Sequence, residues 1–88
     1  MIAITLYSRP GCHLCDEMKA VVERVARSLS LAIPLTIDVV DISADSQLEA
    51  RYGVDIPVLL IAGKKAVKHR VSEEELRRIL IARADREG

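Results

Sequence analysis

Cys12 and Cys15 are the only cysteines in the 88-residue chain, and two residues separate them. A C-x-x-C pair supports reversible dithiol–disulfide chemistry, because one thiolate attacks a disulfide and a second thiol resolves the mixed disulfide. The same spacing also supplies half of a four-ligand zinc site. The elements around the two cysteines must therefore indicate whether thiol exchange or metal binding is favoured.

The cysteine pair lies where a predicted strand turns into a predicted helix. Residues 2–7 are apolar and rich in β-branched residues, which is typical of a strand. Pro10 and Gly11 interrupt that pattern. From residue 12 to residue 29, apolar residues recur every three or four positions, which predicts an amphipathic helix. We therefore expect Cys12 at the start of this helix and Cys15 one turn further, on its apolar face.

This placement gives the two sulfurs different surroundings. The unpaired N–H groups and the dipole at a helix N-terminus stabilise an anion, so the pKa of the Cys12 thiol should fall below its ordinary value. Arg9 adds a permanent positive charge, and His13 adds another when it is protonated. Asp16 opposes them. Cys15 is expected to be more buried and to have a higher pKa, which makes Cys12 the attacking cysteine, Cys15 the resolving cysteine and His13 a tuning residue.

Three further strands are predicted after the first helix. Residues 35–42 are dense in β-branched residues but carry two aspartates, which favours an edge strand. Residues 56–61 are apolar throughout, which indicates a central strand covered on both faces. Residues 66–71 carry polar side chains and are predicted as another edge strand. The first two strands and the helix between them form a β-α-β unit, so we expect them to be parallel.

Two more helices are predicted. A short helix follows the N-cap candidates of residues 43–46, and Gly53 suits its C-terminal end. Its buried line is expected to consist of Ala44, Leu48 and Tyr52. Ser72 begins a last helix, where Glu75 completes a capping box, and residues 84–88 are expected to fray. The order β-α-β-α-β-β-α predicts an α/β protein with a four-stranded mixed sheet and helices on both faces.

Composition and charge exclude several classes of function. The chain has 13 basic and 13 acidic residues, so no basic excess is present to hold a nucleic acid or an anionic membrane. Tyr7 and Tyr52 are the only aromatic residues, which argues against a base-stacking platform. No apolar run approaches the length of a membrane span, and we identify no signal peptide. We expect residues 1–88 to form a single domain that is a cytoplasmic monomer.

Two separate motifs resemble those of the thioredoxin superfamily, and specifically its small glutaredoxin-like branch. They are Thr5-Leu6-Tyr7-Ser8-Arg9-Pro10-Gly11-Cys12-His13-Leu14-Cys15-Asp16 and Ile56-Pro57-Val58. The resemblance implies the three-layer thioredoxin/glutaredoxin-like fold and the activity of a thiol–disulfide oxidoreductase. It also implies a cis bond between Ile56 and Pro57 that faces Cys12. The backbone of Ile56 would then be able to pair with an extended substrate.

The resemblance further implies a set of glutathione or substrate contacts. These residues are Arg9, Ile56, Pro57 and, at the start of the last helix, Ser72. Two departures concern this site: His-Leu stands between the cysteines where glutaredoxins usually carry Pro-Tyr, and residues 70–73 lack the glycine pair of glutathione-binding members. We expect no tightly bound cofactor. The expected substrate is a protein disulfide or a glutathione mixed disulfide, with glutathione as co-substrate and either glutathione or a reductase as electron donor.

Two alternatives remain open. A non-catalytic module would use Cys12 and Cys15 to hold zinc or a shared cluster, and His13 and His69, or a second copy of the chain, would have to complete the ligand set. A protein-interaction domain would leave both thiols idle. Apart from the metal alternative, His69 is interpreted as ordinary surface of the last strand, and thiol exchange is the preferred function.

Overall fold

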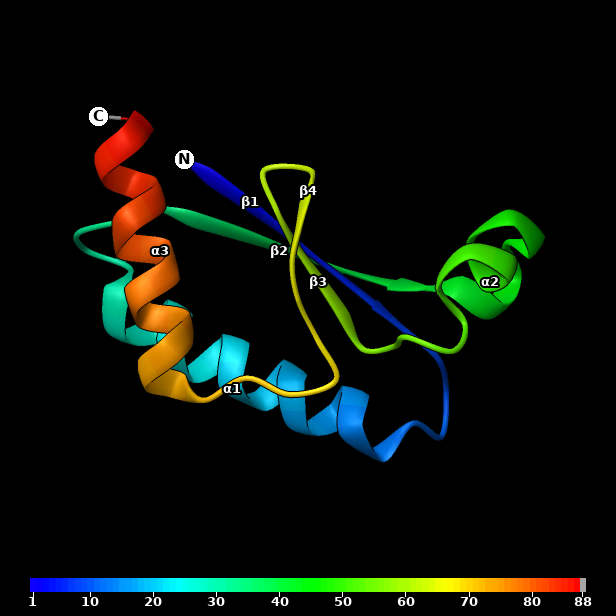
Figure 1. The fold of residues 1–88 in the computed structure, drawn as a ribbon. Coiled ribbons are helices and arrows are strands. Elements are labelled where there is room, and N and C mark those ends of the chain that lie inside the picture. The colour runs from blue at the N-terminus through cyan, green and yellow to red at the C-terminus, as the bar shows by residue number, and fades with distance from the viewer. Residues whose placement is uncertain (88) are drawn as a thin grey trace.

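The computed structural model describes residues 1–87, which form an α/β fold with one mixed sheet of strand order β2-β1-β3-β4 (Figure 1). In chain order the elements are β1 (Ile2–Ser8), α1 (His13–Leu29), β2 (Leu35–Asp41), a 3₁₀ turn (Ile42–Ala44), α2 (Ser46–Tyr52), β3 (Val58–Ile61), β4 (Lys64–Lys68) and α3 (Glu73–Glu87). β1 is parallel to β2 and antiparallel to β3, and β4 is antiparallel to β3. The predicted parallel pairing of β1 and β2, the central β3 and the two edge strands are confirmed.

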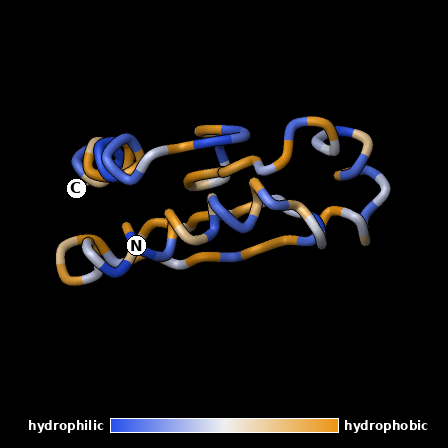
Figure 2. The backbone as a smooth tube through the Cα atoms, turned by 90° about the horizontal axis from the view of Figure 1, so that it is seen from below, coloured by the Kyte–Doolittle hydropathy of each residue, from blue (hydrophilic) through white to orange (hydrophobic). Residues whose placement is uncertain are grey.

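α1 and α3 cover one face of the sheet. Side chains alternate between the faces of a strand, so Ile4 and Leu6 of β1 share a face with Leu59 and Ile61 of β3. The buried core cluster joins these residues to one stripe from each helix: Met18, Val22, Val25 and Leu29 from α1, and Leu76 and Leu80 from α3. Figure 2 shows the matching pattern, with blue and orange alternating along both helices. This core holds α1 against the sheet and thereby sets the position of its first turn.

α2 lies on the other face, at one end of the sheet (Figure 1). Tyr7 points to the face opposite Leu6, and its ring centroid lies 4.9 Å from that of Tyr52. The predicted buried line of this helix is wrong, because α2 has no fully buried residue. Leu48 and Tyr52 are half-buried, whereas Ala44 is exposed and belongs to the preceding 3₁₀ turn. Asp45 caps α2 by accepting from two backbone N–H groups.

Gly53 follows α2, as the sequence predicts, but the reason for glycine is space. Its φ of −53° lies in the right-handed helical region, which any residue can adopt. A Cβ on Gly53 would lie 2.5 Å from the carbonyl oxygen of Glu49. The chain therefore passes α2 too closely for a side chain at this position.

The two strands of the β3–β4 hairpin differ from the prediction in their bounds. Ala62 and Gly63 both have positive φ, 52° and 79°, and they form a two-residue turn of the kind that matches strand twist. β4 therefore begins at Lys64 and ends at Lys68, so the predicted strand over 66–71 is wrong at both ends. β3 begins at Val58, after Pro57 rather than at Ile56. As a result, His69 and Arg70 lie in the loop that leads to α3.

α3 begins as predicted and ends later. The Ser72 hydroxyl accepts a hydrogen bond from the Glu75 N–H at 3.0 Å. The expected fraying is wrong for residues 84–87, because α3 continues to Glu87 and Ala84 packs against the core. Gly88 lies outside the described residues. Within residues 1–87, no helix is both long enough and apolar enough to cross a membrane.

Candidate active site

The cysteine turn lies at the end of the molecule opposite the two termini (Figure 1). β1 ends at Ser8, and the Cys12 N–H donates to the Arg9 carbonyl at 3.2 Å. Gly11 has a φ of 80°, a conformation that glycine adopts without steric cost. The connection between β1 and α1 is therefore tight, and it places both cysteines at the N-terminus of α1.

Cys12 and Cys15 form a disulfide, with their Cα atoms 5.2 Å apart. Cys12 is the N-cap residue of α1 and is half-buried, whereas Cys15 lies in the first turn and is 3% exposed. The Cys15 N–H donates to the Cys12 sulfur at 3.1 Å, so one of the free donors of the helix start is directed at that sulfur. A negative charge on Cys12 would meet this donor and the positive end of the helix dipole.

Pro57 lies at the same end of the sheet. Val58 pairs with Tyr7, so Pro57 lies beside the end of β1, and the Ile56–Pro57 bond is cis. No hydrogen bond within residues 1–87 uses the backbone N–H or carbonyl of Ile56. The backbone polar groups of Ile56 are therefore unpaired within the described residues at this end of the sheet.

Arg9 is bound to α2. One of its terminal nitrogens donates to Glu49 Oε1 at 2.7 Å and to the Gly53 carbonyl at 2.8 Å. The Arg9 Nε and Glu49 Oε2 are buried and have no hydrogen-bond partner among the described residues. The positive charge expected to act on Cys12 is therefore offset by a carboxylate, and the guanidinium joins the cysteine turn to the end of α2.

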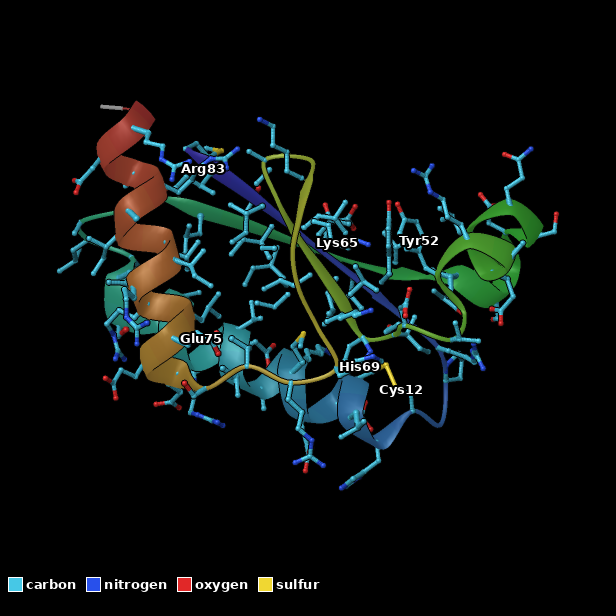
Figure 3. The ribbon with its side chains drawn as sticks, viewed as in Figure 1. Cys12, Tyr52, Lys65, His69, Glu75 and Arg83 are labelled. Atoms are coloured by element: carbon cyan, nitrogen blue, oxygen red, sulfur yellow. A yellow bond between two sulfur atoms is a disulfide. The ribbon has the colours of Figure 1, made fainter. Side chains whose placement is uncertain are left out.

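The two histidines occupy different surroundings. The His13 side chain is 86% exposed, and its Nε2 lies 3.5 Å from Glu17 Oε1. His69 lies on the other side of the turn, where its backbone N–H donates a hydrogen bond to the Pro57 carbonyl at 2.8 Å. His69 borders a cavity of about 370 Å³ together with Leu14, and in the view of Figure 3 its side chain and the disulfide appear at the same end of the molecule. The sequence analysis interpreted His69 as ordinary strand surface and did not predict this position beside Pro57.

The turn of the hairpin was the signal that could have located His69. Ala62-Gly63 as a two-residue turn pairs Val58 with Lys68. This register puts the next residue, His69, beside Pro57. The sequence analysis began the last strand at residue 66 instead of Lys64 and extended it to residue 71, so it kept His69 inside the strand.

Ser72 and Glu73 join the start of α3 to its neighbours. The Ser72 hydroxyl is engaged in capping α3. Arg24 of α1 donates a hydrogen bond to Glu73, and this bond holds the pKa of the Glu73 carboxyl below its ordinary value. The ion pair connects α1 to the α3 end of the cavity that His69 borders.

A second cavity, of about 260 Å³, lies beside Cys15. Charged residues border it, namely Arg9, Asp16, Lys19 and Asp41. The Ser43 hydroxyl and backbone N–H both donate to Asp41 and hold the pKa of its carboxyl below the ordinary value. The resolving-cysteine candidate is therefore buried in the protein but adjoins a polar space.

Comparison with known proteins identifies the family. A family model described as Glutaredoxin-like domain matches residues 3–81. The chain belongs to the glutaredoxin-like family. A glutaredoxin-like protein of Dictyostelium discoideum, the YDR286C homolog, is 31% identical over 77 residues, which cover 85% of this chain and 71% of that protein.

Solved structures agree with this assignment. The X-ray structure of protein XcR50 from X. campestris has a TM-score of 0.72 and 30% identity, with 90% of this chain and 96% of that chain covered. Protein Ne2328 from Nitrosomonas europaea has a TM-score of 0.68 and 26% identity, with coverages of 90% and 91%. A thioredoxin from Halobacterium salinarum shares the fold, with a TM-score of 0.61, 19% identity and coverages of 92% and 73%. The predicted thioredoxin/glutaredoxin-like fold is confirmed.

The glutaredoxin-like family and the bonded cysteine pair together support a redox role. Metal binding by a single chain would need ligands in addition to the two cysteines. Within residues 1–87, no group of three or more His, Cys, Asp or Glu side chains could hold a metal ion. The donor set for a metal is limited there to the two cysteines, which are bonded to each other.

Proposed function

We propose that this glutaredoxin-like protein is a dithiol thiol–disulfide oxidoreductase. The observation that carries the proposal is the asymmetric cysteine pair at the N-terminus of α1. Cys12 caps the helix, is half-buried and accepts the Cys15 N–H, whereas the Cys15 side chain is buried. A sulfur that is reachable and stabilised as an anion suits attack, and a buried neighbour suits resolution.

The proposed reaction begins with the reduced dithiol. The Cys12 thiolate attacks one sulfur of the substrate disulfide, which forms a mixed disulfide and releases the first substrate thiolate. Cys15 then loses its proton and attacks the Cys12 sulfur, which releases the second substrate thiolate. Both leaving thiolates take up protons, two electrons have passed to the substrate, and the product is the Cys12–Cys15 disulfide.

Single-cysteine variants test this division of roles. Cys12→Ser should abolish reduction of a model disulfide, because no attacking sulfur remains. Cys15→Ser should form a mixed disulfide on Cys12 that persists, which mass spectrometry detects. The double variant Cys12→Ser, Cys15→Ser provides the background rate. Disulfide reduction at the wild-type rate by both single variants would contradict the proposal.

The proposed substrates are protein disulfides and glutathione mixed disulfides. The free backbone of Ile56 supports this choice, because it can hydrogen-bond an extended segment on either side of the substrate cysteine. We also propose glutathione as co-substrate, with Arg9, Ile56, Pro57 and Ser72 as its contacts, and with glutathione or a reductase as electron donor. Arg9 already binds Glu49, so a ligand carboxylate would have to share or replace that partner.

Incubation of the Cys15→Ser variant in a glutathione redox buffer tests the co-substrate. An adduct with the mass of one glutathione, bound at Cys12, is the expected product. Arg9→Met should lower the affinity for glutathione while leaving Cys12 present and reactive. If no adduct forms while a disulfide-containing protein is still captured, glutathione is not the co-substrate and the protein substrate remains.

A further inference from the structure

His69 is held at the cysteine turn by its backbone. Its φ of 69° lies in the left-handed region, which is uncommon for a residue other than glycine. Its N–H donates to the Pro57 carbonyl at 2.8 Å, and the preceding residue, Lys68, pairs with Val58. The surrounding sheet therefore maintains an unfavourable backbone conformation at the residue beside Pro57, a combination that is found preferentially at functional sites.

The side chain of His69 is directed toward α1. It borders the same cavity as Leu14 and Met18, which lie in the first two turns of that helix. In the view of Figure 3, the His69 side chain and the disulfide lie at the same end of the molecule and close together in projection. The cavity and the view thus agree that the imidazole lies beside the N-terminus of α1.

The ring of His69 is also unpartnered. Within residues 1–87 it makes no hydrogen bond or ion pair, whereas the His13 ring is 3.5 Å from Glu17. His69 is exposed, and the cavity that it borders is also lined by Glu17 and Arg24 of α1 and by Arg70 of its own loop. The preceding residue, Lys68, is paired with Asp55. Arg24 is engaged with Glu73 and Lys68 with Asp55, whereas the side chain of Arg70, like that of His69, has no partner within residues 1–87.

We propose that His69 is a third catalytic residue, whose imidazole N–H donates to the Cys12 sulfur in the reduced protein and stabilises it as the attacking thiolate. This inference rests on the proposed function, because the thiolate is the species that attacks the substrate. In the disulfide form the sulfur carries no charge, and the ring remains without a partner. Reduction creates the anionic acceptor, and a hydrogen bond to a charged sulfur is among the stronger kinds.

The test measures alkylation of Cys12 by iodoacetamide as a function of pH. The Cys15→Ser background makes Cys12 the only thiol, and no disulfide substrate is needed. His69→Gly accepts the left-handed backbone and removes the ring, so the rate at pH 6 should fall about tenfold, the size of one hydrogen bond to a charged group. His69→Asn also tolerates this backbone and keeps a neutral donor, so its rate should fall less.

His13→Asn serves as the control for His69→Gly. It also removes an imidazole near the N-terminus of α1, but that imidazole lies beside Glu17. It should lower the rate less than His69→Gly does. Urea unfolding of each variant verifies that the fold is retained. The proposal is overturned if folded His69→Gly and His69→Asn proteins keep the parent pH profile. A shifted profile combined with no disulfide reduction by the wild type would instead contradict the proposed function, and it would leave only the hydrogen bond from His69 to the Cys12 thiolate, without a catalytic role.

Discussion

Two segments flank the cysteine turn, and their basic residues are used differently. On the α2 side, Arg9 is bonded to Glu49 and to the Gly53 carbonyl. On the α3 side, the ring of His69 has no partner within residues 1–87, although its backbone is bonded to Pro57. Arg9 is near Cys12 in sequence and His69 is far from it. The difference teaches that the partners of a basic residue, rather than its distance in sequence, decide whether its side chain is free for a further contact.

Gly53→Ala should produce the largest effect on this comparison. The new Cβ would lie 2.5 Å from the Glu49 carbonyl oxygen, so the end of α2 must move, and the Arg9 contacts move with it. We expect the free energy of unfolding to fall by about 1–3 kcal/mol, the usual cost of overpacking, as measured by urea denaturation. Val54→Ala is the control, because that side chain is 91% exposed and should change stability little. Equal stability of the two variants would show that α2 does not anchor the turn.

Arg9→Met should have the next largest effect on stability. It leaves the Glu49 carboxylate and the Gly53 carbonyl without their donor, which costs about 1–2 kcal/mol in urea denaturation after allowance for the partial exposure of both side chains. A double-mutant cycle with Glu49→Gln isolates the coupling of the pair. The comparison predicts that Arg9→Met lowers the free energy of unfolding but changes the rate of Cys12 alkylation little. His69→Gly is expected to lower the alkylation rate but to change the free energy of unfolding little. If Arg9→Met slows alkylation as much as His69→Gly, the contrast between the two sides is wrong.

Glu73→Gln should have the smallest effect on stability, and the size of this effect should depend on pH. The hydrogen bond from Arg24 lowers the pKa of Glu73 in the folded protein, so the ionised carboxylate binds better in the folded state than in the unfolded state. Its stabilising contribution is therefore fully present above the ordinary value of 4.5 and is lost as the pH falls through the lowered folded value. Unfolding experiments at pH 7 and at pH 3 should show the gap between wild type and Glu73→Gln narrowing at the lower pH. A gap that is the same at both pH values would exclude this role of Arg24.

The sequence by itself determined the parts of the fold that depend on local residue types. Apolar residues at helical spacing defined α1 and its buried face, and the capping box defined the start of α3. The placement of the two cysteines follows from the same pattern, because Pro10 and Gly11 stop β1 just before Cys12. A site that consists of one strand, one turn and one helix start can be predicted in this way, since all of its geometry comes from neighbours in the chain.

Only the tertiary structure decided which distant residues meet the cysteine turn. Ala62 and Gly63 set the register of the hairpin, and this register moved His69 out of the strand and to the side of Pro57. The pairing of Arg9 with Glu49 likewise depends on how α2 packs over the end of the sheet. These contacts join elements far apart in sequence, so strand register and helix packing determine them, and the periodicity of each single element carries no information about its distant partner.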